Sequence, residues 1–351
     1  MVETNAGHDS WLSSAIRVIA TSPVLSGISF AAIGILVWML LERSAAQLGA
    51  ASPQATLDGV FVVLLAVQVG YFVSVVPLLR RAGRRCLKQL RPLLHRPDPA
   101  LDTLTDRFFA YRPLVLPPAL VAGGVLTVTL QEAQFNRFSS WLAQPDFALG
   151  ELFIVLLAWT TWSVGLTAVG VVISDVAAMR RVGLKHVTID LLRIEQLAVF
   201  SRYGLHLAGA VIGLMVLWSV SLVIVTSLVG NTLTERSGYV GLLMVITYIC
   251  LSITVFVFPQ LGVRERVRAE KAQLGEQLTS LLPTSRQAVE MAQSDPQRLA
   301  ALLSARADIQ AVSEWPTGQL TRLRLAFYLL VPLLSWSAAA LVEELISRLL
   351  G

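Results

Sequence analysis

Charged side chains are scarce in this sequence. They make up 15% of its 351 residues, whereas hydrophobic residues make up 55%. An average soluble domain carries about 25% charged residues, so this shortage argues against an ordinary soluble fold. Seven stretches contain no Lys, Arg, Asp or Glu: Val18–Leu41, Gly59–Leu79, Pro113–Gln131, Leu152–Ser174, Tyr203–Thr234, Ser237–Val263 and Leu325–Val342. Each is close to the ~20 residues that a helix needs to cross a membrane, and the sequence therefore predicts seven transmembrane helices.

Residues that usually carry out chemistry are also rare. The chain has two cysteines and four histidines. Cys86 falls in a basic segment and Cys250 in the sixth charge-free stretch, so we expect neither a disulfide between them nor a zinc site. The sequence contains no phosphate-binding loop, dinucleotide-binding glycine pattern, metalloprotease helix or nucleophile elbow. The middles of the predicted spans hold no acid or base, which proton relays usually require. We therefore expect no enzyme activity, no metal and no cofactor.

The charges that are present lie unequally on the two sides of the predicted membrane. Of the 28 Lys and Arg residues, 24 fall on the side of the N-terminus and 4 on the side of the C-terminus. Because basic residues are retained in cytoplasmic segments, we predict a cytoplasmic N-terminus and an external C-terminus. The expected fold class is an all-α integral membrane protein with seven spans, in the cytoplasmic (inner) membrane of a bacterium.

The same pattern divides the chain into three parts. Residues 1–261 are predicted to hold transmembrane helices 1–6, with cytoplasmic loops at 80–112 and 175–202. Residues 262–324 form the largest segment outside the predicted membrane, and we expect cytoplasmic amphipathic helices there. Residues 325–351 are predicted to form the seventh transmembrane helix.

Apolar stripes at helical spacing indicate how the cytoplasmic segments fold. Within the second loop, Leu191, Ile194 and Leu197 lie opposite Arg193 and Glu195, as in an amphipathic elbow helix that leads into the fifth span. In the 262–324 segment, a seven-residue rhythm is shared by Val263, Val267, Leu274, Leu278 and Leu281. This rhythm predicts that the sixth span continues as a helix into the cytoplasm.

A second cytoplasmic helix is expected to start at Asp295–Pro296, which has the form of an N-cap followed by a first helical proline. Its apolar stripe comprises Leu299, Leu302, Ile309 and Val312. Apolar stripes of this kind need a packing partner. The two cytoplasmic helices could pack on each other, on the second loop or on a neighbouring subunit.

A dense basic cluster follows the second predicted span directly. Its members are Arg80, Arg81, Arg84, Arg85, Lys88 and Arg91. Clusters this close to a membrane attract anionic lipid headgroups by about 1 kcal/mol per basic residue. This position favours lipid over nucleic acid, so we expect membrane lipids as partners and no nucleic acid.

The last predicted span is unusual for a helix in lipid. Pro332 removes a backbone donor from its middle and predicts a kink, and Ser335 and Ser337 follow directly. Glu343 and Glu344 mark its outer end, on a side where acids outnumber bases by eight to four. The hypothesis is that this helix lines a cation path, because carboxylate rings concentrate cations at a pore mouth. The alternative is a buried kinked helix with solvated glutamates.

Small residues also allow two interpretations. Gly209 and Gly213 form a G-x-x-x-G pattern in the fifth span, which permits close helix approach. The pattern suits a contact between subunits, and it suits packing within one subunit equally well.

The layout as a whole resembles the seven-transmembrane ion channels of the insect chemoreceptor type. The shared features are seven spans, an internal N-terminus, an external C-terminus, long cytoplasmic helices and a last helix that is broken before it re-enters the membrane. The resemblance implies a homo-oligomer whose last helix lines a central pore. That family's tyrosine-containing motif is absent, and "LLSWSAAALVEEL" stands in its place. The segments "IDLLRIEQLAVFSRYG" and "EWPTGQLTRLRLAFYLLVPLLSW" look like those of uncharacterised bacterial multi-pass proteins.

Three classes of function fit these observations. The first is a homo-oligomeric cation channel subunit with the last helix lining the pore. The second is a transporter or lipid-handling membrane protein, and the third is a non-conducting sensor or scaffold. The position of the last helix discriminates among them, because a channel places it on a symmetry axis and a scaffold packs it fully.

Overall fold

The computed structural model describes residues 22–47, 55–93, 115–135, 149–229, 234–281, 295–315, 317–318, 320–331 and 334. These residues form helices joined by short connections, and no β-strand occurs among them. The prediction of an all-helical chain is therefore confirmed for the part of the chain that the structure describes.

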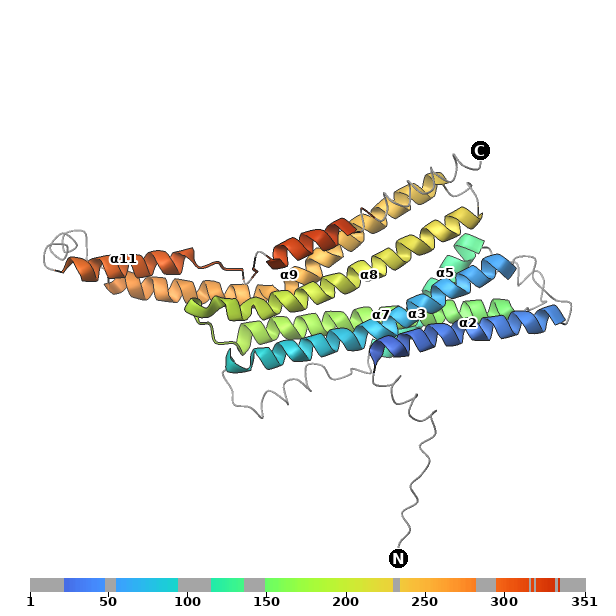
Figure 1. The fold of residues 1–351 in the computed structure, drawn as a ribbon, viewed down its shortest axis with the longest axis horizontal. Coiled ribbons are helices and arrows are strands. Elements are labelled where there is room, and N and C mark those ends of the chain that lie inside the picture. The colour runs from blue at the N-terminus through green and yellow to red at the C-terminus, as the bar shows by residue number, and fades with distance from the viewer. Residues whose placement is uncertain are drawn as a thin grey trace, which may run out of the picture.

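Long helices lying side by side build an elongated bundle (Figure 1). The elements are α2 (Pro23–Gln47), α3 (Ala55–Gln89), η1 (Arg91–Leu93), α5 (Leu116–Phe135), α7 (Leu149–Lys185), η3 (Leu191–Leu197), α8 (Ala198–Val229), α9 (Thr234–Leu281) and α11 (Pro296–Ala311). A further helix occupies residues 320–331.

Five of these helices are long and apolar enough to cross a membrane. The candidate spans are Pro23–Ser44, Asp58–Gln89, Leu149–Lys185, Arg193–Ser221 and Val245–Leu281. They contain or overlap the first, second, fourth, fifth and sixth charge-free stretches, and they make this a helical membrane protein. The third stretch corresponds to a shorter apolar helix, Leu116–Leu130. Most of the seventh lies outside the described residues, so seven spans remain a prediction.

Several helices are much longer than a membrane is thick. The 48 residues of α9 span about 72 Å at 1.5 Å per residue, whereas the hydrocarbon core is about 30 Å thick. This confirms that the helix of the sixth span continues through Leu281. The expected loops begin later than predicted, because α3 runs on to Gln89 and α7 to Lys185. Arg, Lys, Leu and Ala are good helix formers, so charge ends the apolar stretch without ending the helix.

The largest buried core lies where these extended helices meet. It joins α3, α7, α8 and α9 at the end of the bundle that carries Arg84, Lys185 and Arg202, which we call the basic end. Its most deeply buried members are Leu87, Leu90, Met179, Val182, Val187, Leu197, Phe200, Tyr203, Leu207, Val263 and Val267. By contrast, many apolar side chains within the spans are exposed, such as Ile28 and Ile33 on α2. Lipid tails are as apolar as leucine, so no hydrophobic force buries these side chains.

Glycines allow three helix pairs to approach closely. At the crossing of α2 and α3, a Cβ on Gly70 would lie 2.5 Å from the carbonyl oxygen of Gly27. On α8, Gly209 faces the ring of Tyr328, and Gly213 faces the Tyr71 hydroxyl. The G-x-x-x-G pattern thus serves packing within the chain.

The elbow before α8 follows the predicted stripe. Leu191 and Leu197 are buried, whereas Arg193 and Glu195 are exposed. The predicted elbow helix is a 3-10 element, and it breaks at Arg193 (φ −124°, ψ 36°). The break turns the chain into α8 and keeps both leucines in the core.

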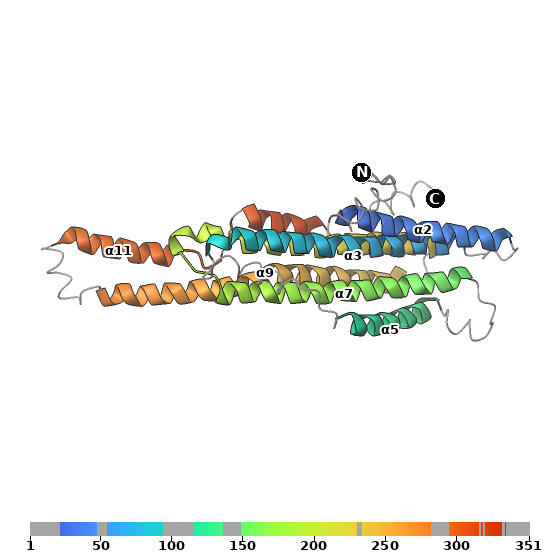
Figure 2. The same cartoon turned by 90° about the horizontal axis from the view of Figure 1, so that it is seen from below.

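The extension of α9 and α11 form a hairpin that projects beyond the bundle (Figures 1 and 2). As predicted, Asp295 caps α11: its carboxylate accepts a hydrogen bond from the Arg298 backbone N–H at 3.1 Å. The predicted stripe also faces inward, since Leu299, Leu302, Ile309 and Val312 are partly buried while most of α11 is exposed.

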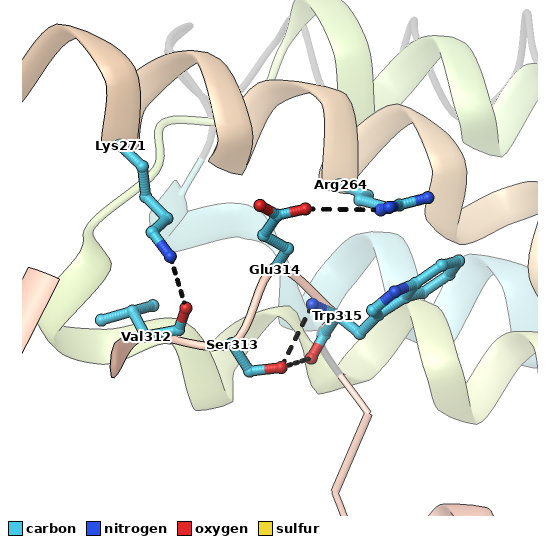
Figure 3. Close-up of polar contacts among 6 residues, drawn as sticks. All are labelled: Arg264, Lys271, Val312, Ser313, Glu314 and Trp315. Atoms are coloured by element: carbon cyan, nitrogen blue, oxygen red, sulfur yellow. Dashed lines mark hydrogen bonds and ion pairs between the residues drawn. The ribbon is translucent and has the colours of Figure 1, made fainter. Parts of the chain in front are cut away.

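Polar contacts fasten the C-terminal end of α11, and the residues that follow it, to α9 (Figure 3). The Lys271 ammonium donates to the backbone oxygens of Gln310 at 3.0 Å and Val312 at 2.8 Å. A cation near the last carbonyls of a helix also complements the helix dipole. About two turns back along α9, the Arg264 guanidinium pairs with Glu314 at 3.6 Å and lies over the Trp315 ring.

Candidate functional site

The predicted basic cluster occupies the last turns of α3 and the adjoining η1. Arg81, Arg84, Arg85, Lys88 and Arg91 are exposed. Five of the six predicted lipid-binding residues therefore lie on the surface at the basic end. The sixth, Arg80, is partly buried and differs from the rest.

Arg80 pairs with an acid on α7. The Arg80 Nε lies 3.4 Å from Oδ2 of Asp175, and the two side chains are 18% and 5% exposed. Breaking such a pair is costly, because an uncompensated charge then remains buried. Asp175 stands at the start of the predicted cytoplasmic loop 175–202, and its pair with Arg80 was not predicted. A signal was present nonetheless: Asp175 stands four residues from both Val171 and Met179, on an otherwise apolar stripe of α7.

A buried tyrosine lies beside this ion pair. Tyr203 of α8 is fully buried and within electrostatic range of Asp175 and Arg80. Among the described residues, its hydroxyl has no hydrogen-bond partner. The basic end therefore concentrates polar groups inside the largest apolar core.

Uncharged polar pairs connect the helices at other levels. Gln68 on α3 donates to the Ser221 hydroxyl on α8 at 3.4 Å. Ser201 on α8 donates to the Gln260 side chain on α9 at 3.1 Å. Interhelical bonds of this kind contribute about 0.6 kcal/mol each. They fix helix register and point to no ligand.

A groove opens between α3, α5 and α7. Helix α5 packs against α7 and stands apart from the rest of the bundle (Figure 2), so α7 forms the floor and the other two helices form the walls. The groove has a volume of about 430 Å³, within the ~300–1,000 Å³ of small-ligand sites. Its surface is largely apolar, with contributions from Phe72, Val76, Leu120, Trp159 and Val164.

Two contacts set the shape of the groove. Gly123 of α5 lies against Ser163 of α7, where an added Cβ would meet the serine hydroxyl at 2.4 Å. The Trp159 indole donates to the backbone oxygen of Leu120 at 2.8 Å. These contacts hold α5 on α7, and Arg80 reaches the wall of the groove at its basic end. The ion pair with Asp175 thus also positions the Arg80 side chain at the groove.

Helix 320–331 uses only part of its surface to contact the bundle. Leu325 and Tyr328 pack against Leu205, Ala208 and Phe256 of α8 and α9. A second apolar stripe is left exposed, consisting of Leu320 (61%), Leu323 (68%), Phe327 (61%), Leu330 (51%) and Leu334 (60%). We call these five residues the outward stripe.

The predicted pore residues themselves lie outside the described residues. They are Ser335, Ser337, Glu343 and Glu344, and the predicted kink residue Pro332 lies outside the described residues as well. The structure reaches the approach to them, helix 320–331, and no further than Leu334.

Side chains that bind metals do not gather in the part of the chain that the structure describes. No group of three or more His, Cys, Asp or Glu residues is placed there to hold an ion. Cys86 is a buried free thiol and Cys250 an exposed one.

No family model, curated protein or solved structure matches this chain. The interpretation of the site therefore depends on its own geometry.

Proposed function

We propose that this chain is a subunit of a homo-oligomeric cation channel in which the last helix lines the pore. The observation that carries the proposal is the outward stripe of helix 320–331. The bundle covers one face of this helix and leaves a second apolar face open.

The spacing of the outward stripe is that of a coiled-coil seam. Its residues recur at intervals of three and four, so that positions repeat every seven residues. A seven-residue repeat suits contact with another helix along the same axis. Copies of this chain arranged around a symmetry axis would bury their outward stripes against one another.

The same register carries the seam toward the predicted pore residues. Counting on from Leu334 in steps of three and four reaches Ser337, Leu341 and Glu344. A narrow apolar segment at the inner end would then lead to a hydroxyl ring and to a carboxylate ring at the outer mouth. Because each subunit supplies one carboxylate, the ring multiplies its attraction for cations.

The proposal includes the seven-span topology in the cytoplasmic membrane of a bacterium. The charge bias and the resemblance in layout to insect chemoreceptor-type channels support it. A tag at Glu3 should be inaccessible from outside intact cells, and a tag after Gly351 should be accessible. Two tags accessible from one side would contradict this topology.

Oligomeric state provides the first test. We expect purified protein in nanodiscs to be larger than a monomer, and Leu323→Ser with Leu330→Ser to dissociate it. The matched control is Ile28→Ser with Ile33→Ser, which changes α2 residues that are similarly exposed, at 60% and 58%. Equal behaviour of the two double variants would assign the outward stripe to lipid and remove the main support for a pore.

Ion selectivity provides the second test, in planar bilayers. We expect cation-selective conductance. Glu344→Gln should reduce the preference for cations, and the addition of Glu343→Gln should abolish this preference. Glu343→Gln alone should have the smaller effect, because Glu343 stands one position outside the seven-residue register. Absence of conductance, or selectivity that ignores both substitutions, would contradict the channel.

A lipid-handling protein is the second candidate, favoured by the groove between α3, α5 and α7. Such a protein keeps its ligand cavity within one subunit and needs no seam between copies. A monomer that binds lipid and conducts no ions would support this candidate over the channel.

A further inference from the structure

The groove has the length of one membrane leaflet. Its floor on α7 runs from Trp159 to Val171, which is about 18 Å at 1.5 Å per residue. Half of the hydrocarbon core is about 15 Å thick. A single acyl chain lying along α7 would therefore cover the floor from end to end.

The polarity of the groove excludes most water-soluble ligands. Its surface is apolar over most of its length. Two of the side chains that line it, Leu116 and Leu120, are also exposed on the surface of the bundle. A lipid reaches such an opening by moving laterally within the membrane. A polar solute would have to leave water first, at a large cost in free energy.

The basic end of the groove suits a phosphate. The contact of Arg80 with Asp175 is made through its Nε, at 3.4 Å. A guanidinium offers five donors in a fork that matches phosphate oxygens. Here the side chain also lies at the end of the apolar floor, where a lipid headgroup would be.

Helical geometry adds one further arginine to this end. Residues turn by about 100° each along an α-helix, so Arg84 lies about 40° from Arg80 around α3. Arg85 lies about 140° from Arg80 by the same geometry, away from the groove. Both Arg84 and Arg85 are exposed, which makes them a matched pair of test positions.

We propose that this groove binds one anionic phospholipid from the leaflet at the basic end. An acyl chain lies on the α7 floor, and the phosphate lies between Arg80 and Arg84. The proposal is narrower than general attraction of headgroups to the basic cluster, because it distinguishes Arg84 from Arg85. It stands whether or not the chain conducts ions.

The experiment is native mass spectrometry of the full chain in mild detergent, titrated with phosphatidylglycerol. We expect one tightly bound phosphatidylglycerol per chain and much weaker binding of phosphatidylcholine. Arg84→Gln should weaken binding about fivefold, the change that ~1 kcal/mol per basic residue corresponds to. Arg85→Gln should leave binding unchanged.

A second arm tests the acyl chain. Thr160 lines the floor, and its hydroxyl donates a hydrogen bond to the Leu156 carbonyl oxygen of its own helix at 2.8 Å. Thr160→Phe should fill the groove and abolish tight binding while Arg84 remains in place. Val73→Phe fills it from the α3 wall and serves if Thr160→Phe does not fold.

Three results would overturn the proposal. Equal losses for Arg84→Gln and Arg85→Gln would indicate diffuse attraction to the surface. Full binding after Thr160→Phe and Val73→Phe would place the acyl chain elsewhere. Displacement of the lipid by millimolar inorganic phosphate would show that the headgroup alone is recognised.

Discussion

Removing the charge of Asp175 should destabilise the bundle more than any exposed charge substitution. The Arg80 and Asp175 side chains approach to 3.4 Å and are 18% and 5% exposed. At an effective dielectric constant of ~20, unit charges at this distance attract by roughly 5 kcal/mol. Desolvation offsets part of this attraction, and removing one partner of a buried pair costs about 3–5 kcal/mol. Because Arg80 keeps some contact with solvent, we expect a loss of about 3 kcal/mol for Asp175→Asn.

A double-mutant cycle isolates the pair from its surroundings. The variants are Asp175→Asn, Arg80→Gln and the two together, and the measurement is equilibrium unfolding in mixed micelles of mild detergent and dodecyl sulfate. We expect the double variant to be more stable than the sum of the single losses predicts, by about 1–3 kcal/mol. The reason is that the second substitution removes the charge that the first leaves buried.

An exposed ion pair of the same chain supplies the control. Arg193 and Asp190 lie 3.9 Å apart, with side chains 73% and 49% exposed. Pairs of this kind couple by about 0.3–0.5 kcal/mol. A coupling energy for Arg80 and Asp175 no larger than that of the exposed pair would refute the reasoning.

Two further predictions concern packing at other levels. Gly70→Ala should lower stability, because the new Cβ would lie 2.5 Å from the Gly27 carbonyl oxygen. Gly275→Ala should instead raise stability by about 0.5–1 kcal/mol through helix propensity, because no atom lies within 4 Å of the new Cβ. Thermal unfolding of both variants checks this contrast, and equal shifts would contradict the close crossing of α2 and α3. Lys271→Met should raise hydrogen exchange several-fold across residues 305–312, because it removes two bonds to the end of α11. Arg268→Met, at an exposed position of the same helix, is the control, and unchanged protection in Lys271→Met would show that the apolar stripe alone holds the hairpin.

Much of the helical organisation could be predicted from the sequence, because it is encoded locally. Charge-free stretches marked the helices, and the seven-residue rhythm from Val263 to Leu281 predicted the extension of α9. Asp295 and Pro296 predicted the start of α11, since capping requires only the residues of one turn. The break at Arg193 was missed because the stripe of η3 has similar spacing in a 3-10 turn and in an α-helix.

The candidate sites depended on which helices are neighbours, and only the tertiary structure decides this. Arg80 and Asp175 are 95 positions apart in the chain, and neither stretch of sequence refers to the other. The groove exists because α5 packs on α7 and leaves a gap toward α3. The outward stripe of helix 320–331 differs from its buried face only in what covers it.

The physical reason lies in the solvent. In water, the apolar face of a helix shows which side is buried, because burial removes that face from water. In a membrane, lipid satisfies an apolar face as well as another helix does, so hydropathy marks where the chain crosses and not which face is covered. The sequence by itself determined helices, their extensions and the distribution of basic residues. The ion pair, the groove and the uncovered stripe arose only when close glycine contacts and polar pairs selected one arrangement of those helices.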